Sequence, residues 1–144
     1  DFVSAEHLIS GPGLVTLYQT LGAKAGQPVA QITPEAIVDR ARSGSDVIAD
    51  STISLFVTWL GRFAGDVALT FGARAGVYIG GIAPRILPFL QDGTFREAFE
   101  DKGRLSSYLA AIPIYVIATP NAGLKGAALA VSRHVERPLA SSMQ

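Results

Sequence analysis

Hydrophobic residues recur at helical spacing through the first third of this chain and predict two helices there. Apolar side chains lie three or four positions apart over residues 14–21, which predicts a helix that ends at Gly22. A second helix is predicted over residues 34–41, because Thr33 is a favourable N-cap and a proline suits the first helical position. Residues 23–32 between them read as a loop.

The longest apolar segment predicts one helix over residues 47–71. One stripe of this helix is expected to consist of four residues: Phe56, Leu60, Phe63 and Val67. Gly61 and Gly65 lie four positions apart, which weakens the helix but lets another backbone approach closely. Arg62 and Asp66 are also four apart and are expected to pair on one face. Two charges at its centre argue against a membrane span and favour a buried core helix.

The spacing of hydrophobic residues changes in the second half of the chain, where two strands are predicted. Residues 76–79 are β-prone and end at Gly80 and Gly81, after which a helix is expected from Pro84 through Leu90. Residues 112–118 form a continuous apolar run, which predicts a second strand buried on both faces.

Two more helices are expected around the second strand. The stretch 94–103 places Phe95 and Phe99 four apart on its apolar side. Residues 119–123 form the exit from the strand, and residues 124–135 form the last helix. The tail over 137–142 is expected to be loose.

The fold class that these elements predict is α/β, rich in helix and with a small sheet. Two strands alone do not make a stable sheet. The chain also begins at Asp1 rather than at a methionine. Both observations favour the interpretation that these residues are a piece of a longer protein.

Composition excludes several classes of function. The 144 residues carry 12 basic and 12 acidic side chains, so no positive field attracts a nucleic acid. The chain has no cysteine, which excludes disulfides, and its histidines are only His7 and His134. A metal site made by this chain is therefore not expected. Ser10 and His7 offer no arguable triad, so nucleophilic catalysis has no support.

Candidate chemistry lies at the glycine turns that follow the two strands. Backbone N–H groups converge where a strand ends and a helix begins, and the helix dipole favours anions there. Gly80, Gly81 and Gly123 are therefore candidate nucleotide contacts. The alternative is that these glycines only allow tight turns, since the chain has neither a P-loop nor a dinucleotide-binding glycine pattern.

Glu6 is the second candidate, because it precedes the Ser10–Gly13 break at the start of the first helix. A carboxylate held by a short turn can accept hydrogen bonds from two neighbouring sugar hydroxyls. The alternative is an ordinary solvated acid near a helix start.

Four segments, taken in order, resemble the C-terminal part of bacterial glucokinase. They are SAEHLISGPGLVTLY (4–18), ISLFVTWLGRFAGDVALTFGARAGVYIGGIAPRI (53–86), FREAFEDKGRL (95–105) and IPIYVIATPNAGLKGAA (112–128). The glycine turn over 79–82 is one small residue shorter than is usual in that family.

The resemblance implies that residues 1–144 are the C-terminal large lobe of a two-lobed sugar kinase with the actin-like ATPase (ribonuclease H-like) fold. It implies phosphorylation of the 6-hydroxyl of glucose with ATP and Mg²⁺, in a cytoplasmic homodimer without nucleic-acid or membrane partners. It assigns Glu6 to the sugar and Gly80, Gly81 and Gly123 to the nucleotide. It places the catalytic base and the phosphate loop before Asp1, so no catalytic residue is expected in this chain.

Two functions of other classes stay open from the sequence. The chain could be the sugar-binding lobe of a sugar-responsive transcriptional regulator, or a non-catalytic dimerisation module that uses the apolar helix over 47–71.

Overall fold

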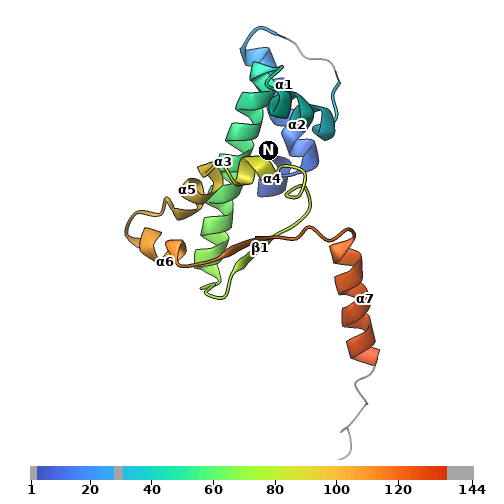
Figure 1. Ribbon diagram of the computed structural model, residues 1–144, viewed down its shortest axis with the longest axis vertical. Helices are drawn as coiled ribbons and strands as arrows, with labels where there is room; N and C mark the ends of the chain where they lie inside the picture. The colour runs from blue at the N-terminus through green and yellow to red at the C-terminus, as the bar shows by residue number, and fades with distance from the viewer. Residues whose placement is uncertain (1–2, 28–30, 136–144) are drawn as a thin grey trace, which may run out of the picture.

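The computed structural model describes residues 3–27 and 31–135, and they form a helical body beside a small sheet (Figure 1). In chain order the elements are η1 (Ala5–His7), α1 (Gly11–Lys24), α2 (Pro34–Ser43), α3 (Val47–Thr70), β1 (Val77–Ile79), α4 (Leu87–Leu90), α5 (Thr94–Glu100), η2 (Gly103–Leu105), α6 (Ser106–Ala110), β2 (Ile114–Val116) and α7 (Ala122–Val135). The helix-rich α/β prediction is confirmed. The expectation for residues 137–142 lies outside the described residues.

Side-chain caps fix where the first three helices begin. The Ser10 hydroxyl accepts a hydrogen bond from the Gly13 N–H at the start of α1, and Thr33 accepts one from Ala36 N–H at the start of α2. Asp46 accepts two such bonds at the start of α3. Each cap pairs a backbone donor that the helix itself leaves free. The predicted role of Thr33 is therefore confirmed.

Helix α3 is the central element of the helical body, and α5 lies directly against it at the two glycines. A Cβ atom at Gly61 would lie 2.5 Å from the Phe95 carbonyl oxygen, and one at Gly65 would lie 2.5 Å from the Phe99 carbonyl oxygen. The close backbone approach predicted from these glycines is confirmed. Phe95 and Phe99 are buried on the apolar side of α5, as their spacing predicts.

The apolar stripe predicted for α3 is partly wrong. Phe56 is fully buried and Leu60 is half-buried, but Phe63 is 45% exposed and Val67 lies at the surface. The buried face instead follows a row of mainly small residues, because the glycines draw α5 onto that side: Ala49, Thr52, Ile53, Phe56, Val57, Gly61, Ala64, Gly65 and Ala68.

The predicted pairing of Arg62 with Asp66 is also wrong. Arg62 contacts Asp101 at 3.3 Å, and Asp66 accepts from Lys102 at 2.7 Å. The two charges on α3 therefore connect it to the segment after α5 rather than to each other. Tertiary partners replace the local pair because α5 ends beside this face of α3.

By length and composition alone, α3 is the one helix in the described ranges that could cross a membrane, and 39% of its apolar stretch is buried in the structure. It packs against α1, α2 and α5 and supplies nine residues to the buried core. This packing favours the predicted core helix.

The sheet consists of β1 and β2 in parallel, with Val77 opposite Ile114 and Ile79 opposite Val116. Its outer face carries Tyr78 and Tyr115, whose rings stack with centroids 5.0 Å apart. Tyr115 is 46% exposed, so the prediction that the second strand is buried on both faces is wrong. The strand alternates because only one face of the sheet is covered by helices in the described structure.

The region after β1 differs from its prediction as well. Residues 81–86 form turns, and the helix begins at Leu87 rather than at Pro84. Pro84 lies within these turns, which place Ala83 and Ile86 in the core.

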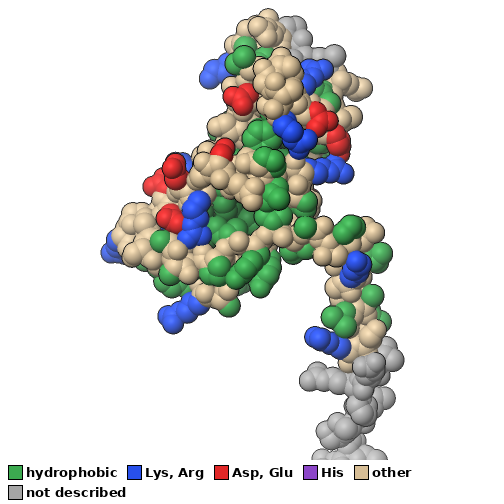
Figure 2. Space-filling model, viewed as in Figure 1, with side chains coloured by type: hydrophobic (Ala, Val, Ile, Leu, Met, Phe, Trp, Pro, Cys, Tyr) green, Lys and Arg blue, Asp and Glu red, His purple; other side chains and the backbone are tan. Residues whose placement is uncertain are grey.

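Helix α7 begins close to its predicted start and extends away from the helical body (Figure 1). Leu124 is 73% exposed on it, and Val131 is 62% exposed. Figure 2 shows hydrophobic side chains at the surface around the sheet and along this helix. The helical body is thus the well-packed part of the described structure.

A partly buried junction connects the first three helices. The Tyr18 hydroxyl donates to Asp46 Oδ2 at 2.6 Å, and Arg40 Nη1 donates to the Tyr18 oxygen at 3.1 Å. The bond from Tyr18 is the main cause that holds the pKa of Asp46 below its usual value, with further help from the backbone N–H groups of Ala49 and Ile48. Burial and the neighbouring carboxylate raise the pKa of Tyr18, so its hydroxyl stays protonated and donates.

We expect Gly61→Ala to destabilise the protein by about 1–3 kcal/mol, because the added methyl group overlaps the Phe95 carbonyl and must push α5 away. Urea unfolding followed by circular dichroism measures the change. The matched control is Gly126→Ala in α7, where a Cβ atom meets nothing within 4 Å. That control should be neutral or slightly stabilising, and an equally neutral Gly61→Ala would contradict the close packing.

We expect Tyr18→Phe to cost about 1 kcal/mol at pH 7 and less at pH 3. The folded pKa of Asp46 is lowered, so its stabilisation is present above the unfolded pKa and is lost as the pH falls through the folded value. The control is Tyr108→Phe, which removes a 2.7 Å bond to the neutral Ala73 carbonyl and should cost the same at both pH values. Urea midpoints at the two pH values decide, and a Tyr18→Phe cost that does not shrink in acid would refute this role of Asp46.

Candidate functional site

The structure brings the glycine turns after both strands to one pocket of about 750 Å³. One wall is the turn after β1, with Gly80 and Gly81, and the other is the segment from the end of β2 to the start of α7, with Gly123. All three predicted glycines therefore line the same space. Sequence reasoning chose them separately, and the parallel pairing of the strands is what places them together.

Backbone geometry explains why this pocket forms. The Ile117 N–H donates to the Ile79 carbonyl at 2.8 Å, and the two strands diverge just beyond this bond. Gly81 has a φ of 66°, in the left-handed region that glycine adopts without strain. Asn121 has a φ of 56°, and α7 begins at the next residue. The segments after β1 and β2 thus both turn sharply and leave an open space between them.

The first N–H groups of α7 lie at this turn. The first helical bond runs from Lys125 N–H to the Asn121 carbonyl at 3.0 Å, so the N–H groups before it are not used within the helix. The helix dipole makes this end of α7 favourable for negative charge. Ala122 and Gly123 also line the pocket.

Arg85 is the charged side chain of the pocket lining, and sequence reasoning missed it. The other lining residues are glycine, proline, alanine, isoleucine, threonine and asparagine, so the wall has no carboxylate. Arg85 forms an ion pair with Glu35 of α2, and its carbonyl accepts a bond from Arg42 at 3.1 Å. Its position directly after Pro84, in the turn that follows the first strand, is the signal that could have found it.

Arg96 of α5 fixes the start of β2. Its Nη1 donates to the Ile112 carbonyl at 2.8 Å, and its Nη2 donates to the carbonyls of Leu109 and Ala110. These carbonyls lie at the end of α6, and β2 begins two residues after Ile112. Arg96 also pairs with Glu100 in its own helix. It therefore anchors the strand that carries one wall of the pocket.

Glu6 lies in η1 and is exposed, and it does not line the pocket that contains the glycines. The turn is held at its start by His7, whose Nδ1 accepts from the Ser4 N–H at 3.0 Å. It packs tightly on α1, because a Cβ atom at Gly13 would lie 2.4 Å from the Leu8 carbonyl oxygen. The structure thus gives Glu6 a fixed backbone and a free approach from solvent.

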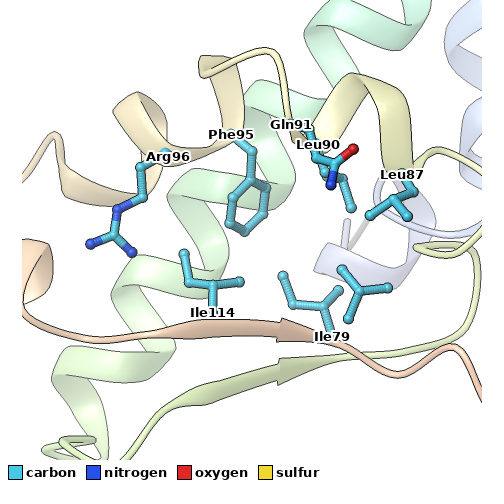
Figure 3. Close-up of a pocket in the computed structure, with 8 residues that line it drawn as sticks. Ile79, Leu87, Leu90, Gln91, Phe95, Arg96 and Ile114 are labelled. Atoms are coloured by element: carbon cyan, nitrogen blue, oxygen red, sulfur yellow. The ribbon is translucent and has the colours of Figure 1, made fainter.

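A second pocket of about 490 Å³ lies between the inner face of the sheet and helices α4 and α5 (Figure 3). Ile79 and Ile114 point into it from the strands, and Leu87 and Phe95 face them from the helices (Figure 3). Its lining is largely apolar, and the Arg96 guanidinium at its edge is already engaged with Glu100 and backbone carbonyls. This pocket lies between the sheet and the helices. None of the predicted site residues lines it.

The structure therefore defines a helix-rich α/β protein with a small parallel sheet and an open glycine-lined pocket at the strand ends. A family model described as Glucokinase matches residues 1–134. The chain belongs to the glucokinase family.

Individual relatives agree with the family match. The glucokinase of Neisseria meningitidis serogroup B is 44% identical over 134 residues, which are 92% of this chain and 41% of that protein. The glucokinase of Psychromonas ingrahamii is 49% identical over 126 residues, which are 87% of this chain and 39% of that protein. The crystal structure of a glucokinase from an Antarctic psychrotroph superposes with a TM-score of 0.79 at 36% identity, over 91% of this chain and 41% of that one. The chain thus spans about two fifths of the length of these relatives.

We expect Arg96→Lys to destabilise the protein by about 1–2 kcal/mol, because one ammonium group cannot reach the three carbonyls that the guanidinium fork holds. Urea unfolding measures the loss, and hydrogen exchange should show faster opening of the amides in β2. The control is Arg104→Lys, at an exposed position in η2. Equal stability of the two variants would show that Arg96 does not anchor the strand.

Proposed function

We propose that this chain is the lobe of a glucokinase that holds the nucleotide and contacts the sugar, in an enzyme that phosphorylates the 6-hydroxyl of glucose with ATP. The observation that carries the proposal is the pocket in which Gly80, Gly81 and Gly123 meet, in a chain that belongs to the glucokinase family. The chain itself spans about two fifths of the length of its relatives, so the proposed activity is that of the larger enzyme.

The pocket has properties that suit a nucleotide. Its volume of about 750 Å³ lies in the range of roughly 300–1,000 Å³ that is typical of small-molecule sites. Cβ atoms at Gly81 and Gly123 would meet nothing within 4 Å, so ligand atoms can approach the backbone at both turns. The start of α7 offers N–H groups and a favourable dipole for an anion. We assign the nucleotide to this space.

Glu6 is proposed as the sugar contact. It projects from a turn whose backbone is fixed by His7 and by packing on α1, so only its side-chain rotamers need to be ordered when a sugar binds. An ionised carboxylate accepts from two adjacent hydroxyls, which gives both affinity and orientation. The role rests on the family resemblance of the segment around it and on this local support.

The described residues do not fit a magnesium site. The pocket lining has no carboxylate, and the described ranges contain no group of three or more histidine or acidic residues placed to hold a metal. We therefore assign Mg²⁺ no ligand among the described residues. Phosphoryl transfer also needs a base that accepts the proton of the sugar hydroxyl and groups that relieve the charge on the phosphates. We propose that these groups belong to polypeptide outside residues 1–144.

The same proposal covers fold type, location and assembly. We infer the actin-like ATPase (ribonuclease H-like) fold, with this chain as the C-terminal large lobe, a cytoplasmic location and a homodimer. The family resemblance supports each of these, and the exposed Phe63 and Phe71 of the apolar segment are available for a subunit contact. The regulator alternative has no support, since the family model and the relatives described above are glucokinases.

A chimera tests the proposal directly. The matched two fifths of the Neisseria meningitidis glucokinase are replaced by residues 1–134 of this chain, and glucose-dependent ADP formation is followed in a coupled assay. We expect the chimera to phosphorylate glucose, because the two segments are 44% identical. The 144-residue chain alone should form no ADP. An inactive but folded chimera, or an active isolated chain, would contradict the proposed division of roles.

In the same chimera we expect Glu6→Gln to raise the KM for glucose about tenfold or more and to lower kcat, while the KM for ATP stays unchanged. The loss of a charged acceptor for two hydroxyls sets this magnitude. Glu97→Gln, at an exposed acid of α5, is the matched control. Glucose kinetics unchanged by Glu6→Gln would remove Glu6 from the sugar site.

A further inference from the structure

The cationic side chain in the pocket wall has no role in the function proposed above. Arg85 lies in the turns that begin at Gly81, and it lines the same space as Gly123. Its side chain is 60% exposed and paired with Glu35, whose side chain is 52% exposed. Exposed ion pairs of this kind contribute little to stability, because water screens both charges. The pair can therefore open at low cost.

Among the described residues, the only formal charge in the lining of this pocket is positive. Arg85 brings a permanent positive charge, and the lining contains no acid to neutralise it. Glu35 belongs to α2 and is not part of the lining. A ligand with negative charge therefore meets an uncompensated guanidinium as soon as Arg85 turns away from Glu35.

Both partners remain supported when the pair opens. Arg42 of α2 donates to the Arg85 carbonyl at 3.1 Å, so the backbone of Arg85 stays connected to α2 while its side chain moves. Glu35 lies in the first turn of α2, where the helix dipole favours a carboxylate even without a counter-ion. The exchange of partners thus requires a change of side-chain rotamers only.

We propose that Arg85 is the phosphate-binding residue of this pocket and exchanges Glu35 for the phosphates of the nucleotide. The inference rests on the proposed nucleotide site and adds the group that distinguishes a nucleotide from a nucleoside. A guanidinium suits this role because its planar fork donates two parallel hydrogen bonds to phosphate oxygens. Glu35 holds the Arg85 side chain beside the pocket until a phosphate replaces it.

The competing explanation is a structural one, in which the Arg85–Glu35 pair only ties the turn to α2. The two explanations differ in what Glu35→Gln does. If the ion pair only holds the turn against α2, then Glu35→Gln and Arg85→Gln disturb the pocket in the same way. If Arg85 binds phosphate, then Glu35→Gln frees the guanidinium and nucleotide affinity is retained or improved.

The experiment measures binding of adenosine, ADP and ATP to the 144-residue chain by titration calorimetry, without divalent metal and at fixed ionic strength. The readout is the ratio of the adenosine Kd to the ADP Kd. Four proteins are compared: the unchanged chain, Arg85→Gln, Glu35→Gln and Arg62→Gln. Arg62→Gln is the matched control, because Arg62 also forms an exposed ion pair and its loss changes the net charge equally. Circular dichroism confirms that each variant is folded.

We expect Arg85→Gln to lower this ratio about tenfold and to leave adenosine binding unchanged. Glu35→Gln should retain or raise the ratio, and Arg62→Gln should leave it unchanged. A ratio unaffected by Arg85→Gln, or lowered equally by Glu35→Gln, overturns the role of Arg85 while adenosine binding still supports the nucleotide pocket. If neither adenosine nor ADP binds the unchanged chain, the nucleotide part of the proposed function fails together with this inference.

Discussion

The contact of α5 with the glycine face of α3 is the constraint on which the rest of the structure depends. The carbonyls of Phe95 and Phe99 occupy the space that side chains at Gly61 and Gly65 would fill. Between these two phenylalanines lies Arg96, which reaches across to the carbonyls at the end of α6. A shift of α5 would therefore move the anchor of β2 and, with it, the segment that forms one wall of the pocket.

The other wall of the pocket depends on a different part of the helical body. The turn after β1 is connected to α2 through the bond from Arg42 to the Arg85 carbonyl. Helix α2 is in turn connected to α1 and α3 by the junction of Arg40, Tyr18 and Asp46. The pocket thus lies between two walls that reach the same helical core by separate routes, one through α5 and one through α2.

Local patterns in the sequence predicted the parts of this structure that local physics controls. The N-cap at Thr33, the close approach at Gly61 and Gly65, the two strands and the last helix were all correct, because capping, steric bulk and hydrophobic period act over a few residues. For the site, the sequence located the glycine turns and the structure placed them in one pocket.

What the sequence could not predict depends on tertiary neighbours. Arg62 and Asp66 have the spacing of a helix pair, yet each found a closer partner after α5. The apolar run around Tyr115 read as a strand buried on both faces, but hydropathy does not reveal how many layers cover a sheet. The position of Arg85 after the first strand made it a possible candidate, but only the fold shows that it lines the same pocket as the three glycines.

Unequal packing on the two sides of the pocket has a consequence for ligand binding. The buried core lies mainly in α1, α2, α3 and α5, whereas the described side chains of α7 are mostly exposed and the sheet has only two strands. Segments with few buried contacts open more readily than a packed core. A ligand that contacts both the turn after β1 and the start of α7 closes off that opening, because it binds only when both walls are in place. Binding across both walls therefore stabilises the sheet and the start of α7 against this opening.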